Sequence, residues 1–404
     1  MTSSPQMAAI VREKTAQAVG ILNELDTDLW LTLVRETSQV KDPVLDLILG
    51  FDLTWLSALL IHRSGSCTAI VGRFDASNFE QLDAYDEVVT YDQAFQPALT
   101  EAIASLDPRT IAINTSENDP AADGLTHGLY RRLTKALGDT PYTSRLVSAE
   151  DLIGALRGRK TPTEIALIRA AVAESQAAIA ELHPSLRPGI SDQEIADVLH
   201  DYARRHNYGT AWDWDGCPHV TVGPESAFGH GMPTGLRAEP GNLVHIDFGL
   251  SVQGFVADLQ RTWYLRATPG EPVPDEVVQA WDAVTRALEA GRAALKPGAK
   301  GWEVDAAARE SLVADGYPEF MHAFGHHIGR TAHDGATVLG PKWERYGTSI
   351  EGVVEVNNTF AIELGVAVPG RGYVSREENV VVTEEGAEYL GPPQPHLWVV
   401  DAVG

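Results

Sequence analysis

Hydrophobic residues in the first part of the chain fall into short runs separated by polar and turn-forming residues. Residues 29–34 and 110–114 contain apolar runs of the length expected for buried strands. Residues 56–61 and 68–71 flank a short polar segment with a glycine, which predicts a β-hairpin. Residues 125–137 repeat apolar positions at helical spacing. The mixture predicts a small α/β domain, and it offers no cluster of metal ligands or nucleophiles.

A helix start marks the end of this domain. Thr161-Pro162-Thr163-Glu164 forms a capping box with proline at the first helical position, and the helix it opens is predicted to run to about Leu182. We therefore place the junction near Arg157, with an N-terminal domain at 1–156 and a second domain at 157–404.

The second domain repeats its own pattern. Leu-Arg-Pro-Gly at 186–189 returns as Leu-Lys-Pro-Gly at 295–298, 109 residues later, and each is followed by a Glu-aliphatic pair. An apolar run that carries one carboxylate, at 246–250, returns 116 residues later at 362–366. Two repeated segments in the same order predict two related half-domains. Each half contains two helices and then strands, so the pattern predicts an α+β fold with a curved antiparallel sheet backed by helices.

Four carboxylates stand in or beside these apolar runs. Asp247 lies within one run, and Asp258 follows 11 residues later after a glycine turn. Glu363 and Glu377 are their counterparts in the second half. A buried carboxylate is costly unless it is paired or binds metal, and four together repel one another. Two divalent cations would neutralise them.

Histidines are concentrated between residues 322 and 334. The segment holds four of them, with glycines beside the central pair, which favours a functional site: His322, His326, His327 and His333. His230 stands between two glycines and is ambiguous by itself. Oxygen-rich ligation with an imidazole suits Mn²⁺ or Co²⁺ better than a closed structural Zn²⁺ site.

Composition narrows the function class. The net charge of -25 makes nucleic acid or anionic membrane partners unfavourable. The two cysteines, Cys67 and Cys217, exclude a disulfide scaffold and suit a cytoplasmic protein. The N-terminus lacks the pattern of a signal peptide, and no apolar run is long enough to span a membrane.

These motifs resemble the pita-bread metallopeptidase family, which includes methionine aminopeptidase, aminopeptidase P and prolidase. The likeness covers about residues 157–390, and the preceding part resembles the additional domain of prolidase, aminopeptidase P and creatinase. The pattern around the histidines, His-x-x-x-His-x-Ile-Gly-x-x-x-His-Asp, looks most like prolidase and aminopeptidase P. The resemblance implies two metal ions, Mn²⁺ or Co²⁺ with Zn²⁺ possible, held by Asp247, Asp258, His326, Glu363 and Glu377. It also implies three active-site histidines outside the metal shell: His230, His322 and His333.

The chain departs from the family pattern in three places. Arg330 and Ala332 replace residue types that are more usual in the histidine segment. Ser375 stands where prolidase-like members carry arginine, two residues before the last metal glutamate. Either Arg376 or Arg371 is a candidate to take over the substrate-binding role of that arginine.

The resemblance implies hydrolysis of an Xaa-Pro bond by a hydroxide between the two metals, which Asp258 and Glu377 would bridge. Glu363 would accept the proton of the water and pass it to the leaving nitrogen. His230 or His333 would stabilise the oxyanion, and His322 would shape the neighbouring pocket.

The substrate is left open between dipeptides, as in prolidase, and the N-termini of short peptides, as in aminopeptidase P. The family resemblance also implies a homodimer. One alternative is a metal-dependent hydrolase of a small non-peptide amide, as in creatinase or ectoine hydrolase. The other is a non-catalytic peptide-binding relative, which the complete set of five ligands argues against.

Overall fold

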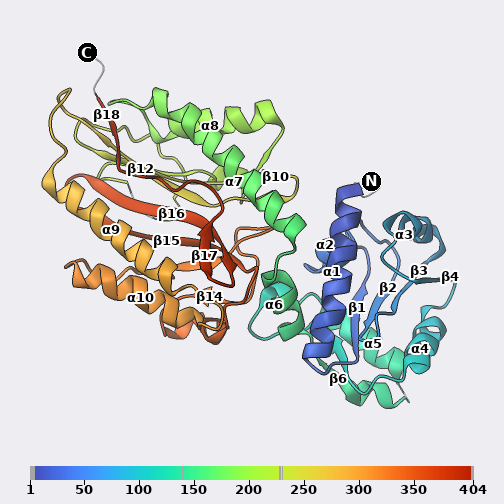
Figure 1. The fold of residues 1–404 in the computed structure, drawn as a ribbon. Helices are drawn as coiled ribbons and strands as arrows, with labels where there is room; N and C mark the ends of the chain where they lie inside the picture. Colours follow the sequence, from blue (N-terminus) through green and yellow to red (C-terminus); the bar gives the residue numbers. More distant parts are fainter. Residues whose placement is uncertain (1–4, 139, 227–228, 230, 402–404) are drawn as a thin grey trace. The chain divides into compact units, whose positions relative to one another are not determined.

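A computed structural model describes residues 5–138, 140–226, 229 and 231–401 of the chain, which divides into two compact units, Met1–Arg157 and Gly158–Gly404 (Figure 1). Among the described residues, no helix is both long and apolar enough to cross a membrane.

The N-terminal unit is a six-stranded mixed sheet covered on both faces by helices. The strand order is β4-β3-β2-β1-β5-β6, with antiparallel pairing in β1–β2 and β2–β3 and parallel pairing elsewhere. Its strands are β1 (Leu29–Val34), β2 (Ser57–His62), β3 (Cys67–Gly72), β4 (Glu87–Tyr91), β5 (Ile111–Ile113) and β6 (Leu146–Ser148). Its helices are α1 (Pro5–Glu24), α2 (Leu45–Ile48), α3 (Ala76–Leu82), α4 (Phe95–Leu106), α5 (His127–Leu137) and α6 (Glu150–Gly158). The strands and the helix expected from the hydrophobic pattern are confirmed.

Alternation along β1 explains the two helical layers. Leu29, Leu31 and Leu33 pack into the core beneath α4 and α5. Trp30 and Val34 pack into the core that holds α1 and α2. Because successive strand residues point to opposite faces, an unbroken apolar run buries both sides of the sheet.

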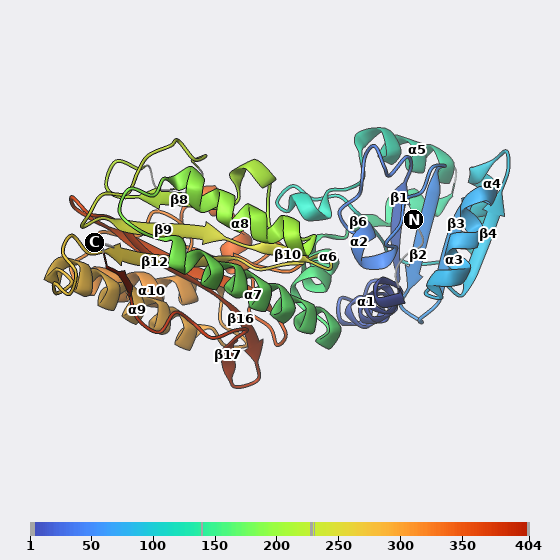
Figure 2. The same cartoon turned by 90° about the horizontal axis from the view of Figure 1, so that it is seen from above.

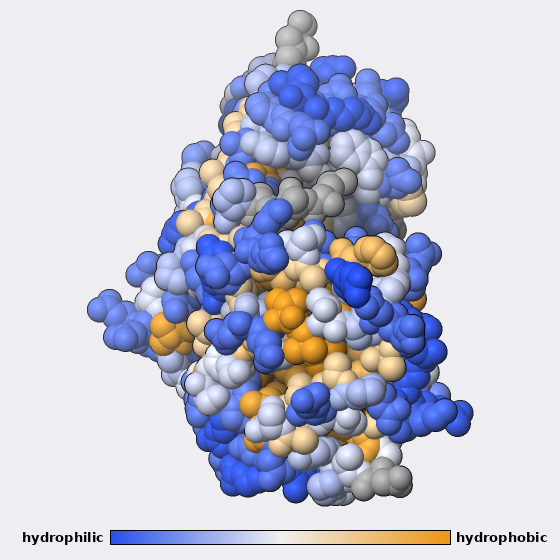
Figure 3. All heavy atoms as spheres, turned by 90° about the vertical axis from the view of Figure 1, so that its right-hand side faces the viewer, coloured by the Kyte–Doolittle hydropathy of each residue, from blue (hydrophilic) through white to orange (hydrophobic). Residues whose placement is uncertain are grey.

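The surface of this unit carries some exposed apolar groups. Phe74 is 79% exposed, and its ring meets Trp55 edge-on at 5.7 Å. Trp55 in turn lies 5.7 Å from Tyr91 at the end of the edge strand β4. Figure 3 shows that hydrophobic side chains gather on one part of an otherwise mostly hydrophilic face. A gathering of this kind is a candidate contact surface for another chain.

The C-terminal unit is built on a nine-stranded sheet. Its main path runs β14-β13-β15-β16-β12-β9-β8, with β17 paired to β16 and β18 to β12. The strands are β8 (His219–Val222), β9 (Leu243–Phe248), β12 (Leu259–Leu265), β13 (Gly325–His327), β14 (Val338–Leu339), β15 (Thr359–Val368), β16 (Gly372–Thr383), β17 (Gly386–Tyr389) and β18 (Trp398–Val400). A small second sheet has the order β11-β10-β7 and consists of β7 (Gly209–Thr210), β10 (Leu250–Val252) and β11 (Phe255–Val256).

Two helix pairs back these sheets. α7 (Pro162–Leu182) packs on β10 and β11, and α8 (Asp192–His206) packs on β8. α9 (Asp275–Ala294) packs on β15 and β16, and α10 (Gly301–Ala314) lies against α9 (Figures 1 and 2). Both halves therefore follow the predicted order of two helices and then strands. The capping box at the start of α7 is present, with Thr161 and Glu164 satisfying each other's backbone groups.

Candidate metal centre

A row of side chains crosses the sheet of the C-terminal unit from strand to strand. The strand registers pair residues directly opposite one another on β8, β9, β12, β16 and β15: His219, Asp247, Gln260, Glu377 and Glu363. Directly paired residues point to the same face of a sheet. The two half-domains thus meet at β12 and β16, and three carboxylates stand in one line across that seam.

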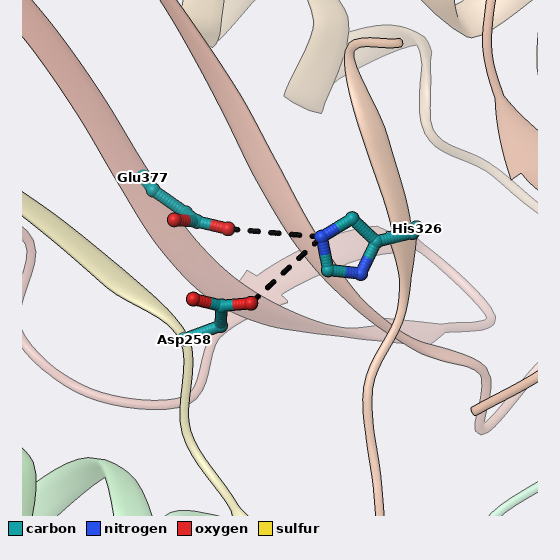
Figure 4. Close-up of side chains that lie close together, drawn as sticks. All are labelled: Asp258, His326 and Glu377. Carbon is teal, nitrogen blue, oxygen red and sulfur yellow. Dashed lines mark ion pairs between the residues drawn. The ribbon is translucent and has the colours of Figure 1, made fainter. Parts of the chain in front are cut away.

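Asp258 and His326 lie beside this row. Asp258 lies one residue before β12, where the Asn379 side-chain amide holds its backbone N–H (3.0 Å) and carbonyl (2.7 Å). His326 lies on β13. Its Nε2 is 3.8 Å from Asp258 Oδ2 and 3.9 Å from Glu377 Oε1 (Figure 4). Each of these three side chains offers a ligand atom, and the atoms lie within 4.8 Å of one another.

The remaining two carboxyls, Asp247 and Glu363, are close enough to shift the titration of the others. Burial raises the pKa of Asp247 to about 7, and a hydrogen bond with Asp258 opposes that shift. Burial and the charge of Asp247 raise the pKa of Glu363 to about 8. Burial first, and neighbouring carboxylates second, raise the pKa of Asp258 and of Glu377 well above the usual values. Without a cation, this centre holds protons in place of charge.

These residues fit a divalent metal. Asp247 Oδ1, Asp258 Oδ1 and Glu377 Oε2 are buried, and within the described part of the chain no group donates a hydrogen bond to them. Buried carboxylate oxygens in that position are costly unless a cation binds them. Burial, followed by the charge of His333, lowers the pKa of His326 to about 3. His326 is therefore neutral near pH 7, the form that binds metal.

The centre forms one wall of a cavity of about 570 Å³. His322 and His333 line it, and the His333 ring stands edge-on to His326 at 4.3 Å. The predicted site residue His230 lies outside the described residues. The lining also includes Trp212, His219, Thr221, Gly229, His245, Asp247, Asp258, Gln260, Phe320, Ala323, His326, Ala332, Val338, Tyr346, Glu363 and Glu377.

Comparison with known proteins agrees with this geometry. Residues 166–384, more than half of the chain, match metallopeptidase family M24. The chain belongs to this family. Membership implies the use of divalent metal, and the predicted pita-bread fold is confirmed by the solved structures that it resembles.

Several proteins similar to this chain are named as Xaa-Pro dipeptidases or aminopeptidases. The chain is 30% identical over 249 residues to the Xaa-Pro dipeptidase of Pyrococcus furiosus, covering 61% of this chain and 67% of that one. It is 28% identical to the Xaa-Pro dipeptidase of Pyrococcus horikoshii, with 89% and 99% covered. The solved X-Pro aminopeptidase of Thermotoga maritima superposes with a TM-score of 0.69 at 26% identity, with 96% and 99% covered. The relatives support a peptidase function for this M24 member.

The two arginines considered as substrate ligands do not line the cavity. Arg376 is buried over the Trp281 ring and donates to Thr285 Oγ1 (3.0 Å), on the helix-covered face of the sheet. Arg371 lies in the turn between β15 and β16, where it bonds the exposed Glu276 and the carbonyl of Gly241. Their placement gives no support to the substrate-binding prediction, because Arg376 precedes Glu377 by one residue and so points to the opposite face.

Three other residues of the cavity were missed from the sequence: His219, His245 and Gln260. A signal existed for two of them. His245 lies two residues before Asp247, and Gln260 lies two residues after Asp258. Alternation along a strand places such neighbours on one face.

Proposed function

We propose that this M24 member is a metal-dependent peptidase that cleaves Xaa-Pro bonds, in dipeptides or at the N-terminus of short peptides. The observation that carries the proposal is the cluster of Asp258, His326 and Glu377, with buried carboxylate oxygens that no described group satisfies. The names of the Xaa-Pro relatives support the substrate.

Asp247, Asp258, His326, Glu363 and Glu377 would hold two divalent ions, which we propose to be Mn²⁺ or Co²⁺, with Zn²⁺ as a further candidate. Bound ions would supply a nucleophilic water near neutral pH and polarise the scissile carbonyl.

The protein's own groups then manage the protons and the developing charge. Glu363 accepts the proton of the attacking water and delivers it to the leaving nitrogen. His333, with its ring against His326, donates to the oxyanion, and His230 is the alternative donor. His322 lines the cavity beside Phe320, where the residue after the bond would lie. Proline is tolerated there because the reaction requires no amide hydrogen at that position.

Whether the protein prefers dipeptides or longer peptides depends on how the cavity binds the free C-terminal carboxylate of a dipeptide. No lysine or arginine occurs among the described lining residues. Histidine side chains are therefore the groups in this lining that could carry a positive charge, when protonated. A series of peptides from Xaa-Pro to longer Xaa-Pro-Xaa substrates would separate the two activities. A sharp loss of rate beyond two residues indicates a dipeptidase, and sustained rates indicate an aminopeptidase.

The polar lining favours a second candidate, hydrolysis of a small non-peptide amide. His219 of the row, together with Thr221 and His245, lines the cavity close to the carboxylates. These polar groups suit a compact polar substrate. A screen of dipeptides against small amides, with the same metal-loaded protein, distinguishes the two candidates.

The direct test strips the purified protein with a chelator and assays Xaa-Pro peptides before and after Mn²⁺ or Co²⁺ is returned. We expect activity to disappear and return. Turnover that survives chelation would contradict the proposal.

The family resemblance also leads us to propose a homodimer. The exposed Phe74 and the neighbouring Trp55 and Tyr91 offer an apolar contact surface for it. Light scattering of the eluting protein would measure the mass, and a monomer would refute this part of the proposal.

A further inference from the structure

Gln260 occupies the centre of the carboxylate row. It pairs with Asp247 on β9 on one side and with Glu377 on β16 on the other, and its side chain is 2% exposed. It is an uncharged residue among charged neighbours. A buried glutamine amide brings two N–H groups and a carbonyl oxygen that need partners. The identity of those partners shows what the residue does.

The amide nitrogen of Gln260 holds Glu363. Gln260 Nε2 donates to Glu363 Oε2 at 2.6 Å, reaching across β16 to do so. The terminal torsion of a glutamate is broad, so a carboxylate without such a bond can rotate freely. A bond to one oxygen fixes the carboxylate plane and leaves the other oxygen for a metal ion. The donor is neutral, so it orients Glu363 without competing with a cation.

The amide oxygen is anchored from the opposite side. It accepts a hydrogen bond from His245 Nε2 (2.9 Å) and another from Ser375 Oγ. Both partners are buried. In the reversed amide orientation, the oxygen would face the Glu363 carboxylate, which accepts hydrogen bonds when ionised and has no proton to donate. The bond to Glu363 therefore selects one orientation of the amide, and with the amide oxygen turned toward it, His245 Nε2 carries the proton.

Small residues make room for this arrangement. Ser375 lies opposite Gly365 on β15, and a Cβ on Gly365 would be 2.7 Å from the Ser375 side chain. Ser375 Oγ also lies 3.0 Å from the carbonyl oxygen of Leu364, so its single proton is shared between that oxygen and the Gln260 carbonyl. A long side chain at position 375 would fill the space in which the Gln260 carbonyl is bound. Ser375 and Gln260 thus work as a pair.

We propose that Gln260 is a positioning residue of the metal centre. Anchored by His245 and Ser375, it holds Glu363 in the orientation that binds metal and transfers the proton. This inference rests on the proposed function, because it requires the metal centre.

The test compares Gln260→Met, which keeps the length of the side chain and removes its hydrogen bonds, with a matched control. Gln394→Met makes the same change at another buried glutamine, whose amide bonds the backbone of Thr262 and contacts no metal-site carboxylate. Metal-free protein is titrated with Mn²⁺ by calorimetry, and kcat and KM are measured on an Xaa-Pro peptide. We expect Gln260→Met to weaken Mn²⁺ binding about tenfold or more and to lower kcat with KM little changed. Ser375→Ala should have a smaller effect in the same direction.

Each outcome bears on the inference. Wild-type Mn²⁺ affinity in Gln260→Met would overturn it while leaving the proposed function intact. An equal loss of affinity in Gln394→Met would also overturn it, since the effect would then be general destabilisation. A wild-type protein that binds no divalent metal would overturn the proposed function and this inference together. A wild type that binds metal but cleaves no Xaa-Pro peptide would refute the substrate alone, and the affinity comparison would still decide the role of Gln260.

Discussion

Four carboxyl groups and five histidines line a single cavity, and no lysine or arginine in the described lining balances the carboxyl groups. The raised pKa values of Asp247 and Glu363, about 7 and about 8, are the signature of that imbalance. A structural ion-pair network would lower the pKa of its acids. Residues whose charged form is this unfavourable are functional-site candidates, because a bound cation reverses the effect.

Glu363→Gln tests the residue that carries the most roles. The change keeps the shape of the side chain. It removes the negative charge of the oxygen that would bind metal, and it removes the group that would accept the proton. We expect kcat to fall by about 10²-fold or more, with the fold retained by circular dichroism. The control is Glu388→Gln on the exposed side of β17, which should keep wild-type kcat. Undiminished turnover in Glu363→Gln would remove Glu363 from catalysis.

At the scale of elements, the site depends on how β15 and β16 fit together. Ten residue pairs join them, from Thr359–Val381 to Val368–Gly372, and Glu363 pairs with Glu377 in the middle. This register sets which side chains share the row. Glycine is required at position 365, two residues after Glu363, because the neighbouring side chains leave no space for a Cβ.

Gly365→Ala should therefore lower the stability of the C-terminal unit. The new methyl would lie 2.6 Å from Tyr373 Cε1 and 2.7 Å from Ser375 Cβ. Overpacking of this kind costs about 1–3 kcal/mol, which urea unfolding would measure. Gly209→Ala is the control, because its methyl would meet Ser251 Cβ at an ordinary 3.4 Å. Equal midpoints for the two variants would show that the strands adjust without strain.

Some elements of this fold are predictable from the sequence, and some of its contacts are not. The strand at Leu29–Val34 and the capping box before α7 follow from local patterns, and the structure has them as predicted. The face on which Arg376 lies also follows from alternation, although the predicted substrate role ignored it. The Gln260 network could not be predicted, because its partners come from β9, β15 and β16. Those contacts exist only once the strand order and register are fixed.

At the scale of the whole molecule, the two half-domains each supply carboxylates to one seam. Asp247 and Asp258 belong to the first half and Glu363 and Glu377 to the second. An ion bound by both halves links them, so metal and fold stability are coupled. Without metal the same coupling makes stability depend on protons.

The pH dependence of the metal-free protein follows from the signs of the shifts. The folded carboxyls have raised pKa values, so the folded state binds protons that the unfolded chain releases, and stability falls as pH rises. Burial lowers the pKa of His326 and His327 from 6.5 to about 3 and that of His245 to about 4, so these histidines act in the opposite direction, and their effect fades as the pH rises through about 6.5. Between about pH 6.5 and about pH 8 the opposing effect of these histidines fades, and the effect of the carboxyls dominates.

We therefore expect the free energy of unfolding of the metal-free protein to decline over that interval. The slope should be about 1.4 kcal/mol per pH unit for each carboxyl that remains protonated in the folded state. Urea titrations at several pH values measure it. Saturating Mn²⁺ should flatten the slope and add about 2.7 kcal/mol at a hundredfold excess over Kd. A metal-free protein whose stability rises across this interval would contradict the assigned protonation states.

The number of divalent ions bound per chain is the decisive measurement for the proposed two-metal centre. Metal-free protein is titrated with Mn²⁺ by calorimetry, and the loaded protein's content is checked by elemental analysis, for the wild type and for Glu377→Ala. We expect two ions per wild-type chain and fewer in the variant, because Glu377 lies between Gln260 and Glu363 in the row and offers a ligand atom close to those of Asp258 and His326. A wild type that binds no divalent ion, or a Glu377→Ala chain that binds as many as the wild type, would contradict it.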